Sequence, residues 1–193
     1  MLTNRPGMCI LKKISLEHKV MKKVVITVSY GSGHAEKYTN EVTPLAAGIE
    51  KTFGDWACIH AYANARYVSM LRDKGMNVYH YTQALETVVE KGFDSVCVVP
   101  LLLTRGKVYG EIVKAAGDFC VSAPLMDSES DFLYIAKIYE KIAMDSGRDV
   151  ILMGHGSADE SDRSYLRLAE VLDDHVHIAC LKGQPEFHPR WLT

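Results

Sequence analysis

The sequence predicts an α/β protein built on one parallel sheet or on two. Apolar runs of strand length alternate with segments of helical periodicity along most of the 193 residues. This order is typical of parallel strands joined by right-handed helical crossovers. The segments around Tyr30 and His155 also resemble each other, because each ends an apolar run and precedes a helical pattern. Duplication of a βαβ half explains that similarity and predicts two lobes, of which the second is incomplete.

The predicted organisation is a leader followed by the two lobes. Residues 1–23 carry five lysines around one short apolar patch, so we expect a poorly ordered leader, with Met1 or Met21 as the start of the protein. Residues 24–146 form the first α/β lobe, and residues 147–193 form a partial second lobe. A partial lobe exposes strand edges and apolar helix faces, which predicts self-association into a homo-oligomer.

Each expected element has a local reason. The run Val24–Ser29 is β-branched and is followed by glycines, and Pro44 predicts that the next helix is kinked or begins near Thr43. Asn64 is a helix-capping residue type. The runs at 95–103 and 150–153 are almost wholly apolar, as in strands buried on both faces of a parallel sheet. The other strands are expected at 56–63, 119–123 and 175–181, and the helices at 36–53, 64–74, 83–91, 107–116, 131–146 and 161–172.

Composition excludes several classes of function. Lysine and arginine number 22 against 24 aspartates and glutamates, so the chain lacks the basic field that nucleic-acid binding requires. Its five cysteines are scattered without a CxxC pair, which indicates reduced thiols rather than a disulfide framework or a cysteine zinc site. No apolar run reaches the roughly 20 residues that cross a bilayer. We therefore expect a cytoplasmic protein with no nucleic-acid or membrane partner.

His155 is the leading candidate for chemistry. It follows an apolar strand and stands between Gly154 and Gly156, and ligands of open α/β sheets bind beyond the carboxyl ends of the strands. A neutral imidazole accepts a proton or coordinates a metal, while the glycines permit a sharp turn and a close approach. The alternative is a loop histidine that only caps the following helix together with Ser157.

Two glycine-containing patterns are weaker. Gly31-Ser32-Gly33 resembles the beginning of a dinucleotide fingerprint, but Glu36 occupies the third glycine position, so no nucleotide cofactor is expected. Gly156-Ser157 is no nucleophile elbow, because the sequence GxSxG is absent there.

Charged and imidazole groups supply the remaining candidates. His175 and His177 alternate on a predicted strand and share a face, so they either chelate a metal or form an exposed pair at a sheet edge. Arg105 and Lys107 flank Gly106 at a strand end. They either pair with ligand carboxylates or are solvated turn residues.

Taken together, four segments resemble the sirohydrochlorin cobaltochelatases of the anaerobic cobalamin pathway, within the class II chelatase superfamily. They are the VSYGS strand end, the helix at Asn64–Gly75, the strand-turn-helix at Pro100–Ile112, and LMGHGS followed by Tyr165. The resemblance implies two Rossmann-like lobes with helices on both sheet faces and a tetrapyrrole cleft between the lobes. It also implies insertion of Co²⁺, or of Fe²⁺ or Ni²⁺, into sirohydrochlorin without a nucleotide.

The resemblance also assigns site residues. His155 matches the family's metal ligand and catalytic base. The implied tetrapyrrole-binding residues are Tyr30, Gly31, Ser32, Arg105, Gly106, Tyr109, Gly156 and Ser157. Leu102 stands where the family has a histidine, Lys182 stands where it has a glutamate, and the family's second metal-binding histidine falls beyond residue 193.

These departures leave three hypotheses open. Unit charges about 4 Å apart repel by on the order of 4 kcal/mol at an effective dielectric constant of about 20, so Lys182 disfavours a metal ion but attracts carboxylates. The first hypothesis is a cobalt chelatase in which His155 is metal ligand and base. The second is a non-catalytic tetrapyrrole or haem binder, and a truncated gene product without activity is the third.

Overall fold

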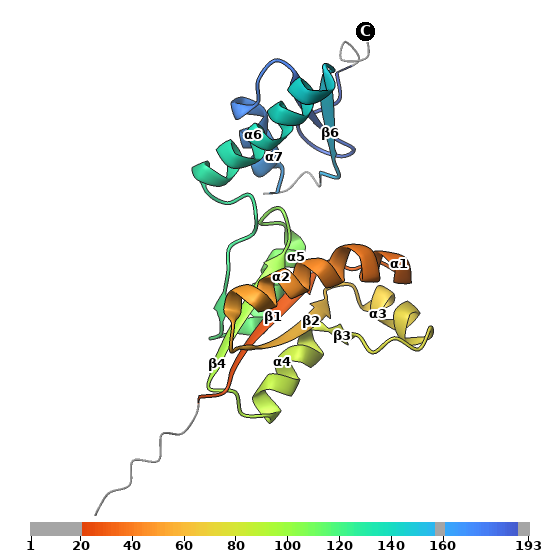
Figure 1. The fold of residues 1–193 in the computed structure, drawn as a ribbon, viewed down its shortest axis with the longest axis vertical. Helices are drawn as coiled ribbons and strands as arrows, with labels where there is room; N and C mark the ends of the chain where they lie inside the picture. The colour runs from red at the N-terminus through yellow and green to blue at the C-terminus, as the bar shows by residue number, and fades with distance from the viewer. Residues whose placement is uncertain (1–20, 157–160, 189–193) are drawn as a thin grey trace, which may run out of the picture.

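The structure, a computed structural model, describes residues 21–156 and 161–188, which form two lobes (Figure 1). The first lobe contains a five-stranded sheet with the strand order β3-β2-β1-β4-β5, and the second contains the pair β6-β7. All of these strand pairs are parallel. The predicted α/β class is therefore confirmed.

The elements alternate along the chain as expected. The strands are β1 (Lys23–Ser29), β2 (Ala57–Tyr62), β3 (Tyr79–His80), β4 (Ser95–Leu101), β5 (Cys120–Val121), β6 (Val150–Gly154) and β7 (Val176–Cys180). The α-helices are α1 (Ala35–Lys37), α2 (Thr43–Phe53), α3 (Ala65–Arg72), α4 (Tyr81–Glu90), α5 (Lys107–Ala116), α6 (Glu129–Ser146) and α7 (Ser161–Val171), with a π-helical turn at Tyr38–Val42. β3 was not predicted, because two residues carry no periodicity.

The local signals explain most element ends. α2 begins at Thr43 with Pro44 in its first turn, which is one of the two alternatives that the sequence left open. Proline is tolerated there because the first turn of a helix needs no backbone N–H donor. The Asn64 side chain accepts hydrogen bonds from the backbone N–H groups of Arg66 and Tyr67 and so caps α3.

β1 is the centre of the first lobe. Val24, Ile26 and Val28 are fully buried in the cluster that includes side chains of α4 and α5. Val25 and Thr27 on the opposite face are also fully buried, and α2 packs over β1 and β2 on that side. β1 is therefore covered on both faces, as its apolar run indicated.

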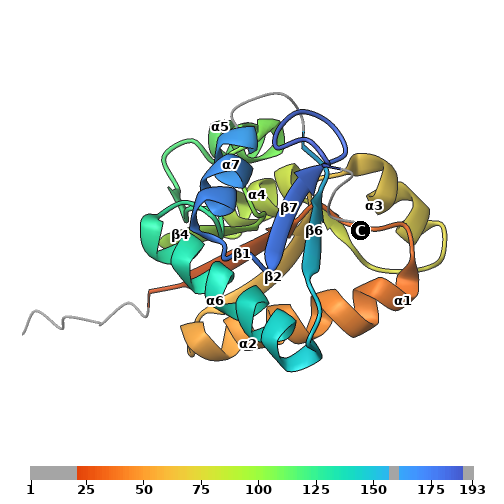
Figure 2. The same ribbon diagram turned by 90° about the horizontal axis from the view of Figure 1, so that it is seen from above.

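The second lobe has a separate core around α6 and α7. Phe132 and Ile135 of α6 pack with Leu168 of α7 and Ile178 of β7, and Figure 2 shows both helices beside the pair β6-β7. The predicted boundary at residues 146 and 147 assigned α6 to the first lobe. We propose instead that the second lobe begins near Met126, which belongs to the same core. The sequence could not show this, because helical periodicity does not reveal which sheet an apolar face will cover.

β6 differs from its prediction. It was expected to be buried on both faces, but none of its residues is fully buried and Met153 is 52% exposed. Within the described residues, α6 and α7 supply the core on one face of this two-stranded sheet, so the apolar run alone overestimated its burial.

The described helices give no sign of a membrane span, since none of them combines the length and hydropathy that crossing a bilayer requires.

His60 is a partly buried polar group in the first lobe. Its Nδ1 lies 2.8 Å from Thr27 Oγ1, and its Nε2 lies 3.3 Å from Ser29 Oγ. Both partners come from β1, the strand paired with β2. Burial lowers the pKa of His60 from 6.5 to about 4, because the charged imidazolium loses its hydration.

The pKa of His60 predicts a loss of stability in mild acid. Between pH 6.5 and pH 4 the unfolded chain binds a proton at His60 that the folded chain does not, so stability falls as the pH falls through this window. We expect the free energy of unfolding to drop by about 2 kcal/mol from about pH 7 to about pH 5 through His60. Urea titrations at the two pH values measure it.

Replacing His60 by glutamine should remove this part of the pH dependence. The same replacement at the exposed His34 leaves the His60 hydrogen bonds in place and provides the control variant. An unchanged slope in His60→Gln would show that His60 is not the titrating group.

Candidate functional site

The pairing of β6 with β7 fixes the position of His155, the first residue beyond β6. Gly154 lies opposite Cys180 in the register. The Leu181 backbone N–H donates to Gly154 O at 2.9 Å, and the Lys182 N–H donates to His155 O at 3.0 Å. The backbone of His155 is therefore held by the chain that leaves β7, while its side chain is exposed.

Gly156 makes this arrangement possible. Its φ is +61°, and a Cβ atom added there would lie 1.6 Å from Lys182 O and 2.7 Å from Cys180 Cβ. A side chain would therefore collide with backbone as well as strain the dihedral angle. The sequence suggested a glycine for close approach, and one group that approaches Gly156 closely is the backbone beyond β7.

A cavity of about 430 Å³ lies next to His155. Its walls come from the ends of three strands and the elements that follow them, in both lobes. The residues are Tyr30 after β1, Leu102 to Thr104 and Gly106 to Tyr109 after β4, His155 and Gly156 after β6, and Tyr165 of α7. The carboxyl ends of β1, β4 and β6 therefore meet at one hollow, which is where α/β sheets bind ligands.

Several predicted site residues line this cavity together, namely Tyr30, Gly106, Tyr109, His155 and Gly156. Lys107, named from the sequence as a candidate for binding carboxylates, also lines it, and its ammonium lies 3.9 Å from Glu111.

Other predicted residues have structural roles outside the lining. Gly31 has a φ of +99°, and a Cβ atom there would lie 2.9 Å from the Tyr62 ring. The Ser32 hydroxyl accepts a hydrogen bond from the backbone N–H of His34 at 3.2 Å. Ser157 lies outside the described residues.

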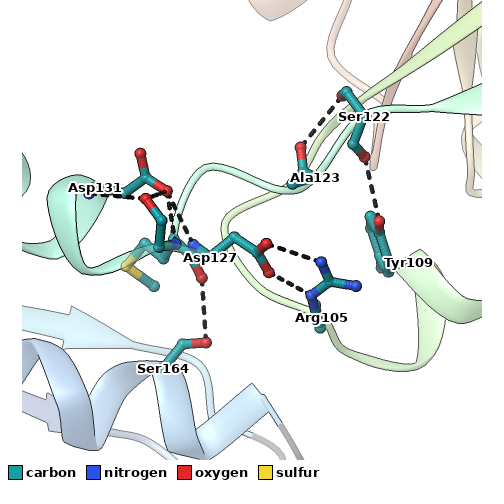
Figure 3. A network of polar contacts seen from close by, with 9 residues as sticks. Arg105, Tyr109, Ser122, Ala123, Asp127, Asp131 and Ser164 are labelled. Atoms are coloured by element: carbon teal, nitrogen blue, oxygen red, sulfur yellow. Dashed lines mark hydrogen bonds and ion pairs between the residues drawn. The ribbon is translucent and has the colours of Figure 1, made fainter.

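Arg105 is not among the residues that line this cavity. The sequence left it open as a partner of ligand carboxylates or as a solvated turn residue. Its guanidinium forms a bidentate ion pair with Asp127 and lies 5.3 Å from the centre of the Tyr109 ring (Figure 3). The guanidinium lowers the pKa of the Asp127 carboxyl through their hydrogen bond. Arg105 therefore joins the loop after β4 to the chain entering the second lobe. The sequence could not reveal this, because Asp127 is 22 residues away.

The ring of His155 has one nitrogen engaged. Its Nδ1 lies 2.7 Å from Gly156 O, and a carbonyl oxygen only accepts hydrogen bonds, so the neutral ring carries its proton on Nδ1. The lone pair then resides on Nε2. That tautomer suits both metal coordination and proton acceptance.

The metal donors near His155 are few. Among residues 21–156 and 161–188, no three histidines, cysteines or acidic residues gather as a metal cluster. Leu102 contributes an apolar wall to the cavity. Lys182 is exposed next to the backbone of His155. Within the described chain, the cavity combines one imidazole with aromatic walls and a lysine.

The predicted pair His175 and His177 is not assembled for chelation. His175 precedes β7, at the opposite end of that strand from the His155 loop, and its Nδ1 lies 2.8 Å from Asp149 Oδ1. Asp149 raises the pKa of His175 through this contact. His175 is thus an exposed ion-pair partner of Asp149, whereas His177 is half-buried in β7.

Sequence reasoning gave no role to Tyr165. Its ring lines the cavity and packs against Gly154, where a Cβ atom would lie 3.2 Å from Tyr165 Cε1. Burial raises the pKa of its phenol. The available signal was its position in the helix that follows the glycine-histidine-glycine strand end.

The comparisons with known proteins identify the family of this chain. A model of the cobalt chelatase (CbiK) family matches residues 23–189. The chain belongs to this family. The curated sirohydrochlorin cobaltochelatase of Salmonella typhimurium is 22% identical over 163 residues, which cover 79% of this chain and 61% of that protein. This member of the cobalt chelatase family therefore spans 61% of that curated relative's length.

The fold agrees with the family. The solved structure of SirB from Bacillus subtilis with Fe³⁺ matches with a TM-score of 0.62 at 20% identity, covering 86% of this chain and 68% of that one. The predicted chelatase-like fold is thereby confirmed.

Replacing Gly156 by alanine tests the close approach. Because the added Cβ meets a backbone carbonyl at a positive φ, we expect the free energy of unfolding to fall by at least about 2 kcal/mol. Gly110→Ala in α5 is the matched control. A Cβ there meets nothing within 4 Å, so it should stabilise the helix by roughly 0.5–1 kcal/mol. Urea unfolding measures both, and equal effects would contradict the assigned contact.

Proposed function

We propose that this chain binds a polycarboxylate tetrapyrrole of the sirohydrochlorin type next to His155 and inserts Co²⁺ into it. The observation that carries the proposal is the imidazole of His155 at a cavity where three strand ends meet. Membership of the cobalt chelatase family supports the metal, and the similarity to the curated sirohydrochlorin cobaltochelatase supports the substrate class.

The chemistry assigns His155 two consecutive tasks. Insertion exchanges two pyrrole N–H protons for one divalent ion, so each turnover needs a metal donor and a proton acceptor. The lone pair on Nε2 serves only one of these at a time. His155 therefore delivers the ion first and accepts one proton after the ion has left it, and solvent takes the second proton.

The tetrapyrrole is held by complementary groups. Tyr30, Tyr109 and Tyr165 offer aromatic surface around the cavity, which suits a flat conjugated ring. Lys107 and Lys182 offer ammonium groups to the substrate carboxylates. The cavity volume of about 430 Å³ lies within the range typical of small-molecule sites. Because this cavity is open to solvent, it would cover only part of the tetrapyrrole ring.

A second function rests on the donor set. His155 is the one histidine in the lining of the cavity, and the described residues contain no metal cluster. The same cavity therefore suits a tetrapyrrole or haem binder in which His155 is an axial ligand and no metal is inserted. The two functions share the ligand class and differ in turnover.

Insertion is tested by mixing the full chain with sirohydrochlorin and Co²⁺ and following the absorbance change. We expect a rate above the protein-free control, and loss of that excess in His155→Ala. The exposed His34, which does not line the cavity, provides the control variant His34→Ala with an unchanged rate.

A wild-type rate equal to the protein-free control would exclude the chelatase. If His155-dependent binding of haem or sirohydrochlorin persisted, measured by absorbance shifts and quenching of Trp56 fluorescence, the binder would be the function.

We also propose that a second copy of the chain covers the apolar side of the second lobe. Tyr134, Ile138 and Ile142 are 67%, 42% and 47% exposed, and their spacing of four residues places them along one stripe of α6. Within the described residues β6 pairs only with β7, so its other edge is also open. A twofold axis would bring equivalent stripes and edges together and close the contact.

Self-association is measured by light scattering after gel filtration over a range of concentrations. We expect a dimer that Ile138→Glu dissociates by burying a carboxylate in the contact. Val113→Glu, at a 39%-exposed apolar position of α5, should leave the dimer intact. A monomer at all concentrations would overturn the proposal.

A further inference from the structure

Two cysteines lie directly opposite each other in the first sheet. Cys97 of β4 is the register partner of Cys120 of β5. Neighbouring strands lie about 4.8 Å apart, and disulfides join residues whose Cα atoms are about 4.4–6.8 Å apart. The backbone therefore already holds these residues at a distance that a disulfide can span.

Both thiols are on the less covered face of the sheet. Val96 and Val98, the neighbours of Cys97 in β4, are buried in the core with α4 and α5, so Cys97 points to the opposite face. On that face α2 packs over β1 and β2. Cys97 is partly buried and Cys120 is exposed, so a small reagent can reach Cys120 from solvent.

The two thiols also interact chemically. Burial, and then the neighbouring Cys120, raise the pKa of Cys97 to about 11. Cys97 is thus a thiol at neutral pH in the reduced protein. It is placed to resolve an adduct formed first on the exposed Cys120.

A bond between Cys97 and Cys120 would affect the connection between the lobes, because β5 lies at its start. β5 has only two residues, and the segment 122–127 after it leads into the second lobe. This segment is fixed to the region after β4 by hydrogen bonds from the N–H groups of Leu125 and Met126 to Leu102 O and Leu103 O. It ends at Asp127, which pairs with Arg105 (Figure 3). A bond at Cys120 would therefore restrain the start of the connection between the lobes.

We propose that Cys97 and Cys120 form an oxidation site that reacts with low-molecular-weight disulfides and closes as a cross-strand disulfide. The Cys120 thiolate attacks the small disulfide and releases one thiol, leaving a mixed disulfide. The Cys97 thiol then loses its proton to solvent as its sulfur attacks the Cys120 sulfur, and the second small thiol is released. One small disulfide is reduced to two thiols, and the two protein thiols lose two protons and two electrons.

Oxidation of the native full chain with oxidised glutathione tests the site. We expect peptide mapping to recover residues 97 and 120 in one cross-linked product that has lost two hydrogen atoms, and reduction to reverse it. Hydrogen exchange across 122–127 should slow in the oxidised protein. In Cys97→Ser, glutathione should remain attached to Cys120.

Cys58 supplies the matched control. It is the register partner of Val25 on the other side of β1, and Val25 in turn pairs with Cys97, so Cys58 is about 10 Å from Cys97. Cys58→Ser should therefore leave the cross-link unchanged. Recovery of the cross-link only after denaturation in urea, or an unresolved glutathione adduct on Cys120 of the wild-type chain, would overturn the proposal.

Discussion

The candidate site depends on the contact between Gly156 and the backbone that leaves β7. Parallel pairing aligns Gly154 with Cys180 and continues as hydrogen bonds from Leu181 and Lys182 to the carbonyls of Gly154 and His155. With no side chain on Gly156, the two backbones can lie against each other. The imidazole of His155 is consequently exposed on a hydrogen-bonded turn, with its Nδ1 proton engaged and its Nε2 lone pair available.

The cavity then requires both lobes to be held in place. One wall belongs to β1 and to the region after β4, and the other belongs to β6 and α7. The ion pair of Arg105 with Asp127, and the hydrogen bond from Ser164 of α7 to Met126 O at 3.4 Å, link these walls (Figure 3). Arg105 thus takes part in the link between the two walls, and Lys107 and Lys182 are the cations that we propose for the substrate carboxylates.

Much of the first lobe could be predicted from local patterns. β-branched apolar runs located β1 and β4, Asn64 located the start of α3, and Pro44 located the start of α2. The lower burial of β6 and the boundary that we propose to move to the start of α6 have a common cause. Periodicity reports that a face is apolar but not what covers it. β3 was missed because its two residues carry no pattern.

The sequence by itself determined the α/β class, the order of the elements, the family resemblance and the place of His155 at a strand end. These follow from short-range preferences and from the rule that ligands bind beyond the carboxyl ends of parallel strands. Only the tertiary structure decided that Arg105 pairs with Asp127, that Tyr165 lines the cavity, and that Cys97 lies opposite Cys120. Such contacts join residues far apart in the chain, so they depend on how the elements pack and on no local pattern.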